Sequence, residues 1–385
     1  MGLGFINTAL GALVLGSASG AWFFLGRHNK MQRSRTEDDT GVTISLLRSP
    51  NELSRFDIVI LFVAAIFKHV GGLFGGNQPR PDKKSAQQFA LPEVRVKGLL
   101  RISDEAERLF VRSIVHPSEP DTNARQFVNP LFLPALTSPL VIQILVDRAC
   151  PVKPLGCVNT HNTLKFNDGR YCRNIKTLTF LSQAGRLSYS AVFGGQQRPG
   201  YRRKRGMEFC IEISIFCDGS PHAILTQELW YLQFMHPSVQ PQYAPTAPDL
   251  KQDDVALGEV LADQILRMDK QDPQRWAKSC KDYNPIHVST IGAKLFGFRS
   301  VIAHGNHTAA LAAHLFLQNR DACAKSVVTE LSDPFILNLR FERPLILPTE
   351  ADVRWYGLGL HEKTSFSVSR NDKTCVTGSF ELDWK

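Results

Sequence analysis

Apolar and polar positions follow the same order twice along the chain, beginning near residue 127. In the first stretch, the apolar run Pro139–Ala149 predicts a buried helix. Runs of strand length follow this helix, most of them alternating and one apolar on both faces. They predict strands at Val158–Phe166, Lys176–Ser182, Arg186–Phe193, Met207–Cys217 and Ala223–Gln233.

The second stretch follows Pro237–Pro248, a segment rich in Pro and Gln that we interpret as a link between halves. Gln264–Met268 predicts an opening strand, and the apolar run Thr308–Leu317 predicts a helix. A helix followed by several strands, twice over, predicts an α+β chain with halves at residues 127–245 and 250–385. The later strands are expected at Ile336–Glu342, Asp352–Leu358, Ser365–Ser369 and Cys375–Leu382.

The chain begins with an uncharged apolar segment. Phe5–Gly26 is long enough to span a bilayer, and positive charge on its far flank predicts an anchor in residues 1–30 with the rest of the chain on the cytoplasmic side. The membrane of the endoplasmic reticulum and that of the mitochondrion both remain open. A cleaved signal peptide is the alternative, although the usual positive charge before the apolar run is missing. The flanking basic residues are Arg27, Lys30, Arg33 and Arg35.

Residues 31–126 are expected to form a linker and an N-terminal extension. Gln32–Thr43 is polar and charged, and Asn77–Ala86 is rich in Pro, Lys and Gln. Between them, the apolar run Ile58–Phe67 is too short to span a bilayer. Two interpretations remain for this run: an interfacial or re-entrant segment, or a helix packed on the catalytic body.

The composition is that of an ordinary globular protein, with 43% hydrophobic and 21% charged residues. The net charge is +9, but the basic residues are scattered and no nucleic-acid motif accompanies them, so nucleic acid is not an expected partner. Acidic lipid headgroups, the phosphates of coenzyme A or an acidic carrier protein suit this charge, and solubility alone would also explain it. The cysteines form no Cys-x-x-Cys pair, which predicts buried thiols in a reducing compartment rather than metal ligands.

The clearest functional signal lies in the second half. Asp282 and His287 are five residues apart across the rigid turn Asn284-Pro285, so a carboxylate and an imidazole can reach one water molecule. His304-Gly305 then opens the predicted helical run. A glycine there can bring an N–H group close to a carbonyl oxygen, with the positive end of the helix behind it. Addition of water to a conjugated thioester requires this combination of an acid/base pair and a carbonyl-polarising amide.

Ser279–His287, with Ala293–Phe298 and Ile302–Gly305, resembles the MaoC-like, (R)-specific enoyl thioester hydratase/dehydratase family. The resemblance implies the hot-dog fold, in which an antiparallel sheet wraps a long helix, and a double hot-dog for this chain of two halves. Single hot-dog domains of the family pair as dimers, so two halves in one chain would replace that dimer internally. Family members usually have Gly where this chain has Lys281.

The resemblance also implies roles for the motif residues. Asp282 and His287 hold and activate the water, Asn284 orients this pair, and Gly305 donates its N–H group to the thioester carbonyl. No metal or other cofactor is expected. Further polar residues in or near the motif are candidate substrate contacts: Ser279, Tyr283, Lys294 and Arg299.

Three of the histidines that follow the motif lie in or next to the predicted helical run. We interpret His304 as a structural residue that braces the start of the helix rather than as the base. His307 and His314 are seven apart and share a helical face, but a third ligand at a suitable spacing is missing. We therefore interpret both as packing or surface residues.

The first half does not repeat the catalytic motif. Asn129-Pro130 echoes Asn284-Pro285, but phenylalanines stand where Asp and His would be needed, at Phe127 and Phe132, and we interpret the echo as chance. One active site per chain is therefore expected, with the first half supplying wall and acyl-chain space. The basic loop Gln196–Arg205 should be exposed, either as a contact for phosphate or an anionic surface or as a solvated hairpin tip.

The expected function is reversible hydration of trans-2-enoyl thioesters to (3R)-3-hydroxyacyl thioesters, with an acyl-CoA or an acyl carrier protein thioester as substrate. Two alternatives remain, a hot-dog thioesterase and a non-catalytic acyl-thioester binding or scaffold protein. Gly16 and Gly20 in the apolar N-terminal segment would also let two anchors approach and form a homodimer.

Overall fold

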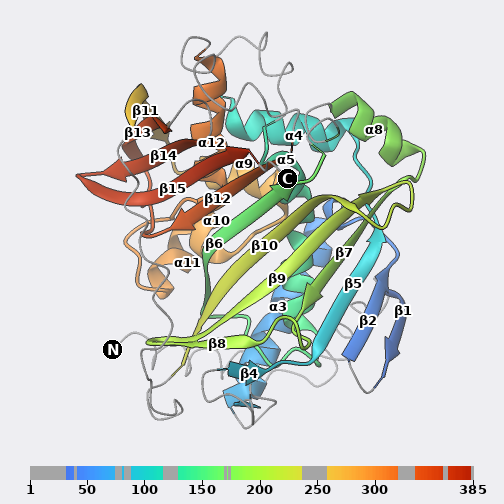
Figure 1. Cartoon of the computed structure of the whole chain (residues 1–385). Coiled ribbons are helices and arrows are strands. Elements are labelled where there is room, and N and C mark those ends of the chain that lie inside the picture. Colours follow the sequence, from blue (N-terminus) through green and yellow to red (C-terminus); the bar gives the residue numbers. More distant parts are fainter. Residues whose placement is uncertain are drawn as a thin grey trace.

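The computed structural model describes most of the chain from Gln32 onward (Figure 1). The predicted anchor in residues 1–30 and the predicted link Pro237–Pro248 lie outside the described residues, as does most of the predicted linker Asn77–Ala86. Within the described part, the helices are all too short or too polar to cross a membrane. The described residues are 32–38, 41–73, 80–81, 88–115, 129–168, 171, 175–235, 258–319, 334–358 and 363–382.

The strands form one continuous sheet that passes through both halves of the chain (Figure 1). Along the sheet the order is β1 (Gln32–Glu37), β2 (Gly41–Leu46), β5 (Glu93–Leu99), β7 (Leu187–Phe193), β9 (Gly206–Cys217), β10 (Ala223–Phe234), β6 (Cys157–Phe166), β12 (Phe335–Phe341), β15 (Lys373–Leu382), β14 (Lys363–Arg370), β13 (Thr349–Leu358) and β11 (Glu259–Met268). Three short strands lie beside this path: β3 (Arg80–Pro81), β4 (Gln88–Ala90) and β8 (Gly200–Arg203), of which β8 pairs with β9.

The two halves meet where β6 pairs with β12. These strands run antiparallel, with Leu164 opposite Leu337 and Asn162 opposite Leu339. Backbone hydrogen bonds therefore join the halves directly, and the side chains of both halves contribute to one hydrophobic core. Because the backbones of β6 and β12 are hydrogen-bonded to each other, the two halves are not independent lobes joined by a linker.

Each half places helix against its part of the sheet, as the twofold pattern predicted. In the first half, α6 packs on β5, and Leu136, Leu140 and Ile144, which recur every four residues, are fully buried. In the second half, α12 packs on β11, β14 and β15, and its alanines let the helix approach the sheet closely. The helices are η1 (Pro50–Glu52), α3 (Arg55–Leu73), α4 (Asp104–Ile114), α5 (Phe132–Thr137), α6 (Pro139–Val146), α8 (Ile175–Gln183), α9 (Asp272–Cys280), α10 (Pro285–Val288), α11 (Thr290–Leu295) and α12 (Gly305–Gln318).

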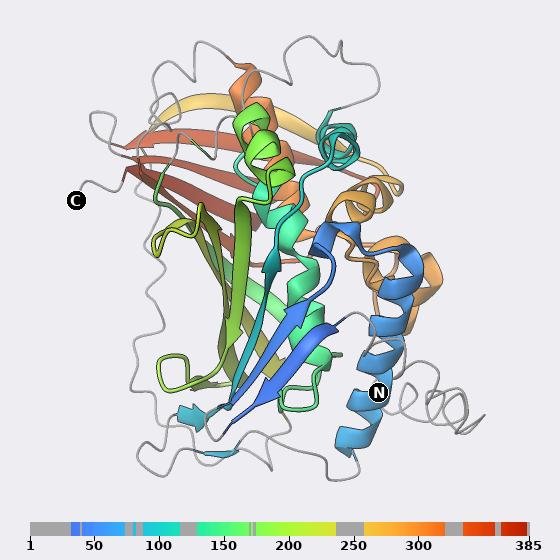
Figure 2. The same cartoon turned by 90° about the vertical axis from the view of Figure 1, so that its right-hand side faces the viewer.

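The second apolar run forms most of α3, and this helix packs on the body of the protein. Ile58, Ile60, Leu61 and Ala65 are buried in a cluster with Val146 of α6. Figure 2 shows α6 lying between the sheet and α3. Of the two interpretations of this run, the helix packed on the catalytic body is confirmed.

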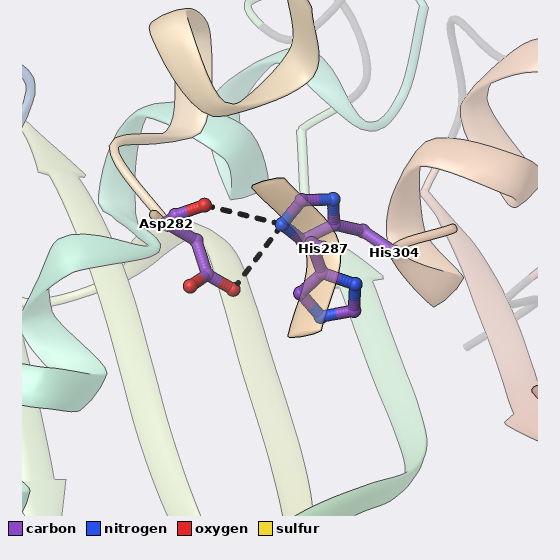
Figure 3. Close-up of side chains that lie close together, drawn as sticks. All are labelled: Asp282, His287 and His304. Carbon is purple, nitrogen blue, oxygen red and sulfur yellow. Dashed lines mark hydrogen bonds and ion pairs between the residues drawn. The ribbon is translucent and has the colours of Figure 1, made fainter. Parts of the chain in front are cut away.

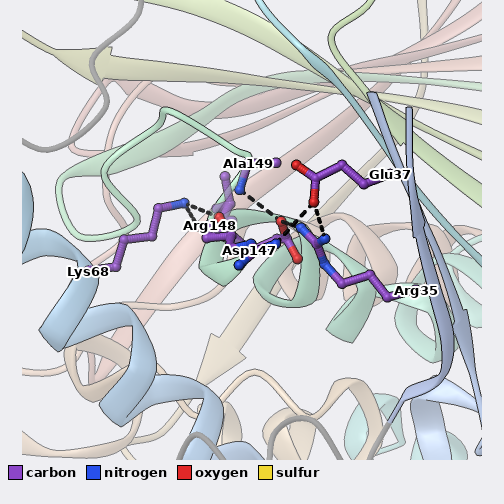
Figure 4. Close-up of polar contacts among 7 residues, drawn as sticks. Arg35, Glu37, Lys68, Asp147, Arg148 and Ala149 are labelled. Carbon is purple, nitrogen blue, oxygen red and sulfur yellow. Dashed lines mark hydrogen bonds and ion pairs between the residues drawn. The ribbon is translucent and has the colours of Figure 1, made fainter. Parts of the chain in front are cut away.

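A polar network ties the N-terminal residues to the end of α6 (Figure 4). Lys68 of α3 donates to the carbonyl oxygen of Asp147 at 2.8 Å, which satisfies an acceptor that the helix end leaves open. The buried carboxylate of Asp147 accepts from the N–H of Ala149 at 2.8 Å and lies 3.3 Å from Arg35 of β1. The prediction that Gln32–Thr43 is a linker is therefore wrong, because β1 and the start of β2 belong to the sheet.

One predicted strand is also wrong. Lys176–Ser182 forms helix α8, in which Leu178, Leu181 and Ser182 are buried and Phe180 is 63% exposed. A strand with an alternating buried face would have buried Leu178, Phe180 and Ser182 together. The spacing of three to four between buried positions is that of a helix, and the alternating pattern in this short segment concealed it.

The basic loop Gln196–Arg205 is exposed only in part: Gln196, Gln197, Lys204 and Arg205 are exposed, whereas its other arginines are paired or buried. Arg198 pairs with Glu212 at 2.6 Å, Arg203 pairs with Glu208 at 2.7 Å, and Arg202 is 7% exposed. These arginines therefore hold β8 and the loop against the outer face of β9. Most cysteines in the described residues are buried free thiols, as predicted, and the reducing compartment stays a prediction.

Candidate active site

The catalytic turn begins where α9 ends. Lys281 adopts the left-handed conformation, with φ of 56°, and its N–H donates to the carbonyl oxygen of Ala277 at 2.9 Å. A residue in this conformation closes a helix and reverses the chain, and glycine is the residue that adopts it at least cost. The backbone here therefore explains why glycine is usual in the resembled family, and Lys281 keeps the same turn with a side chain.

Two asparagine bonds then shape the turn that carries Asp282. Asn284 is the N-cap of α10: its side-chain oxygen accepts from the N–H of Ile286 at 3.3 Å, and Pro285 occupies the first helical position. The N–H of Asn284 donates to Oδ1 of Asp282 at 3.1 Å. Asn284 thus holds the carboxylate through its backbone and starts the helix that carries His287.

His287 is held in one tautomer by the backbone. Its Nδ1 lies 2.8 Å from the carbonyl oxygen of Ile302. A carbonyl oxygen can only accept, so Nδ1 carries the hydrogen and Nε2 has a free lone pair. Burial lowers the pKa of His287 below its ordinary value, against the opposing effect of Asp282. The imidazole is therefore neutral near pH 7 and able to take a proton at Nε2.

His304 lies between the turn and α12 (Figure 3). Its Nε2 donates to the carbonyl oxygen of Asp282 at 3.2 Å and lies 3.6 Å from Oδ2 of the same residue. Its ring stacks on that of His287, with centroids 3.7 Å apart. Burial, followed by the neighbouring histidines, lowers the pKa of His304 well below its ordinary value. His304 is therefore a neutral donor that fixes the backbone and carboxylate of Asp282.

Asp282 is the solvent-accessible member of the cluster. The side chain of Asp282 is 41% exposed, whereas that of His304 is 7% exposed. One ligand atom of each of Asp282, His287 and His304 lies within 4.8 Å of the others, so these residues could together hold a metal ion. Each histidine places one ring nitrogen at a backbone carbonyl, which leaves its other nitrogen free for an ion as well as for a proton. The expectation that no metal takes part stays a prediction.

Gly305 is the first residue of α12, directly after His304. A side chain at this position would collide with Phe341, because an added Cβ would lie 2.3 Å from its ring. Only glycine therefore lets the start of the helix lie against β12. The N–H groups of a first helical turn have no partner within the helix, so those at Gly305 are available to an oxygen of a ligand.

Comparison with known proteins agrees with this geometry. Residues 255–363, which include the whole cluster, match the family model of the MaoC like domain. This part of the chain is a MaoC-like domain. A curated relative, 3-hydroxyacyl-thioester dehydratase X of Mycobacterium tuberculosis, is 26% identical over 236 residues, which are 58% of this chain and 68% of the relative. These matches confirm the resemblance and the expected enzyme class, a hydro-lyase.

Two solved structures match a larger share of the chain at lower identity. The crystal structure of HtdX from Mycobacterium tuberculosis is 19% identical, with a TM-score of 0.49, and the match covers 75% of this chain and 100% of that one. The crystal structure of a MaoC-like dehydratase from Phytophthora capsici is 12% identical, with a TM-score of 0.49, and the match covers 78% and 96%.

The predicted substrate contacts of the MaoC-like domain do not converge on the cluster. Ser279 is 2% exposed inside α9, and Tyr283 packs towards α3, where the guanidinium of Arg55 lies 6.0 Å from its ring centre. Lys294 and Arg299 are exposed, on α11 and just beyond it. Their contact with substrate stays a prediction.

The structure adds His304 to the cluster, where the sequence indicated only a structural residue. The two descriptions are compatible, because His304 caps α12 and also contacts Asp282. The position of His304 directly before Gly305 was the feature of the sequence that could have placed it in the cluster. The polar partners of α12 in the first half, described below, had no signal in the sequence, because strand pairing alone brings them to the site.

Proposed function

We propose that this protein catalyses the reversible hydration of trans-2-enoyl thioesters to (3R)-3-hydroxyacyl thioesters. The observation that carries the proposal is the placement of the Asp282 carboxylate, the free Nε2 of His287 and the start of α12 around one opening. The relative named as a 3-hydroxyacyl-thioester dehydratase supports the same chemistry, with dehydration as the reverse direction.

In the hydration direction, water is held between Asp282 and His287. Nε2 of His287 removes a proton from the water as its oxygen bonds to C3 of the enoyl thioester. The electrons of the C2–C3 double bond move towards the carbonyl, and an enolate forms. The same proton then passes to C2, so that the elements of one water molecule have been added and the site returns to its starting state.

The start of α12 stabilises the enolate. The N–H group of Gly305 donates to the thioester oxygen as negative charge develops there, and the helix dipole adds to this attraction. Loss of one such donor typically costs about 2.7–4 kcal/mol of transition-state stabilisation. Both Asp282 and His287 come from one short turn, so they reach one face of the planar C2–C3 bond. The resulting addition is syn, and we propose the 3R alcohol from the family resemblance.

Incubation of the purified protein with crotonyl-CoA tests the proposal. We expect loss of the conjugated double bond without release of free thiol, and chiral analysis should give the 3R product. Release of thiol would indicate a thioesterase instead, and neither reaction would indicate a binding or scaffold protein. A predominantly 3S product would contradict the assignment of the reacting face.

We also propose that the two halves act as a double hot-dog and that residues 1–30 anchor the protein in a membrane, with the catalytic half on the cytoplasmic side. The anchor is supported by the uncharged segment Phe5–Gly26 and the basic residues that follow it. The full-length protein should sediment with membranes, and deletion of residues 1–30 should release an active form. Extraction of the full-length protein by alkaline carbonate alone would contradict an integral anchor.

A further inference from the structure

A row of three asparagines connects the first half of the chain to the first turn of α12. Nδ2 of Asn159 donates to the carbonyl oxygen of Trp230 at 2.9 Å and to Oδ1 of Asn162 at 2.8 Å. Nδ2 of Asn162 then donates to Oδ1 of Asn306 at 2.9 Å. Asn159 and Asn162 belong to β6, whereas Asn306 is the second residue of α12. A side-chain relay therefore crosses from the non-catalytic half to the helix that begins at Gly305.

The direction of this relay is fixed at its far end. The carbonyl of Trp230 can only accept, so the atom of Asn159 that faces it is the amide nitrogen. That nitrogen has a second hydrogen, which requires an oxygen on Asn162, and the nitrogen of Asn162 then requires an oxygen on Asn306. Each carboxamide is thus held in one of its two orientations, and the relay ends on the amide nitrogen of Asn306.

This nitrogen carries two hydrogens that can be donated, and it belongs to the residue that directly follows Gly305. Among the residues that the structure describes, Nδ2 of Asn306 has no hydrogen-bond partner, and the residue is partly exposed, whereas Asn162 is 2% exposed. Side chains of a helix lean towards its N-terminus, so that of Asn306 leans towards Gly305 and His304. The donors therefore lie beside the N–H groups that the first turn of α12 leaves free.

We propose that Asn306 is a second donor to the thioester carbonyl, next to the N–H of Gly305, and that Asn162 is the positioning residue that keeps the Asn306 donor turned towards the substrate. This inference rests on the proposed hydration of enoyl thioesters. It also gives the first half a part in catalysis, because two of the three asparagines belong to that half. Two donors on one oxygen stabilise an enolate more strongly than one.

Asn306→Asp separates this role from a structural one. The carboxylate still accepts from Nδ2 of Asn162, and an acidic residue in the first turn of a helix stabilises that helix, so the melting temperature should not fall. The donor, however, is gone, and kcat should fall about a hundredfold. Asn306→Ala, which removes the donor without adding charge, should lower kcat by a similar factor. Wild-type kcat in both variants would overturn the proposal.

Asn162→Asp tests the relay itself. Aspartate at position 162 accepts from Asn159 and also from Nδ2 of Asn306, so the carboxamide of Asn306 turns round and presents its oxygen to the substrate. We expect kcat to fall by a larger factor than the factor by which KM changes. The control is Asn338→Asp, on the opposite face of the same strand pair, where Asn338 accepts from Thr163 at 3.0 Å. That variant keeps its acceptor and should match the wild type. An equal loss of kcat in both variants would overturn the relay.

A readout without turnover distinguishes this inference from the proposed function. Butyryl-CoA with a ¹³C-labelled carbonyl cannot be hydrated, and the infrared stretch of its bound carbonyl reports the donors that contact it. The stretch should shift to lower frequency on binding to the wild type and return part of the way in Asn306→Asp and Asn162→Asp. An identical shift in all three proteins would overturn the inference even if crotonyl-CoA is hydrated. Failure of the wild type to hydrate crotonyl-CoA would overturn the proposed function and, with it, this inference.

Discussion

Both halves of the chain place an Asn-Pro pair at the start of a helix, and both asparagines close the same local turn. Oδ1 of Asn129 accepts from the N–H of Leu131 at 3.0 Å, and Oδ1 of Asn284 accepts from the N–H of Ile286 at 3.3 Å. In each case the proline occupies a position where a missing N–H costs nothing. The likeness in sequence therefore reflects a shared turn closed by an asparagine side chain, which caps a helix at Asn284 and precedes one at Asn129, and not a shared catalytic site.

The two turns differ in the residues that flank them and in what those residues contact. Nδ2 of Asn129 donates to the carbonyl oxygen of Ala310 in α12 at 2.8 Å, and Phe132 after it is 1% exposed. The turn at Asn284 instead carries Asp282 before it and His287 after it, facing an opening. The same backbone device fastens one half to the other in the first case and presents an acid/base pair in the second. The residues that flank a turn, rather than the turn itself, decide its function.

The largest expected effect comes from removing the flanking residues of the second turn. Asp282→Asn and His287→Ala should each lower turnover by at least about a hundredfold, because each removes a group that holds or deprotonates the water. Both proteins should remain folded, which circular dichroism would check. The control in the first half is His161→Gln, on the outer face of β6, which should leave turnover unchanged. Near-wild-type turnover in either site variant would show that the acid/base pair is elsewhere.

Acid sensitivity should be greater in the second half, where burial lowers the pKa of His287, His304 and His307, than in the first, where among the described histidines it lowers that of His161. The first half buries an amide and a hydroxyl, with Gln227 donating to Thr137 at 2.9 Å, whereas the second buries the imidazole of His307 against the carbonyl of Ser113. Burial lowers the pKa of His307 to about 4. The imidazole of His307 is therefore protonated less readily in the native state than in the unfolded chain, where its pKa is about 6.5. The resulting stability is present above pH 6.5 and is lost as the pH falls towards 4, by about 3 kcal/mol.

His307→Gln measures this contribution, because glutamine can still donate to Ser113 but does not titrate. Urea unfolding at pH 7 and at pH 4.5 should show a smaller loss of unfolding free energy in the variant than in the wild type. His222→Gln, at an exposed histidine of the first half, is the control and should keep the wild-type dependence. If His307→Gln is as acid-sensitive as the wild type, His307 does not titrate as its burial predicts.

Replacing the two asparagines should affect different quantities: mainly stability for Asn129 and mainly kcat for Asn284. Asn129→Ala leaves the N–H of Leu131 without its acceptor and removes the second donor to the carbonyl of Ala310, which keeps its bond within α12. The free energy of unfolding should fall by about 2 kcal/mol with little change in kcat. Asn284→Ala removes a partly exposed cap worth about 1 kcal/mol, but it should lower kcat further, because the cap starts the helix that carries His287. Denaturation and turnover measurements on both variants check this contrast between stability and kcat. Equal effects of the two substitutions on both quantities would remove the distinction between the turns.

Periodicity predicted the order of helix and strands in both halves, because buried faces leave a regular trace in the sequence. It failed at Lys176–Ser182, where alternation over a short helix resembled a strand. It also failed at Gln32–Thr43, whose strand positions are polar on one face and read as a linker. The catalytic turn was predictable because Asp282, Asn284 and His287 are close in the chain. The relay through Asn162 was not, because pairing of β6 with β12 brings together residues 144 positions apart.

The smallest expected effect concerns Lys281, which holds the left-handed conformation that glycine favours. Lys281→Gly should relieve backbone strain of about 1–2 kcal/mol, offset in part by about 0.4–1 kcal/mol of added freedom in the unfolded chain. The net gain in unfolding free energy should therefore stay near or below about 1 kcal/mol. The comparison in the first half is Asp218, which has the same φ of 56° and pairs with Arg186. Aspartate tolerates this conformation better than lysine, so Asp218→Gly should lose its ion pair and gain no stability. Thermal denaturation of both variants measures these changes in stability. A destabilised Lys281→Gly protein would show that the lysine side chain stabilises the catalytic turn by more than its backbone conformation costs.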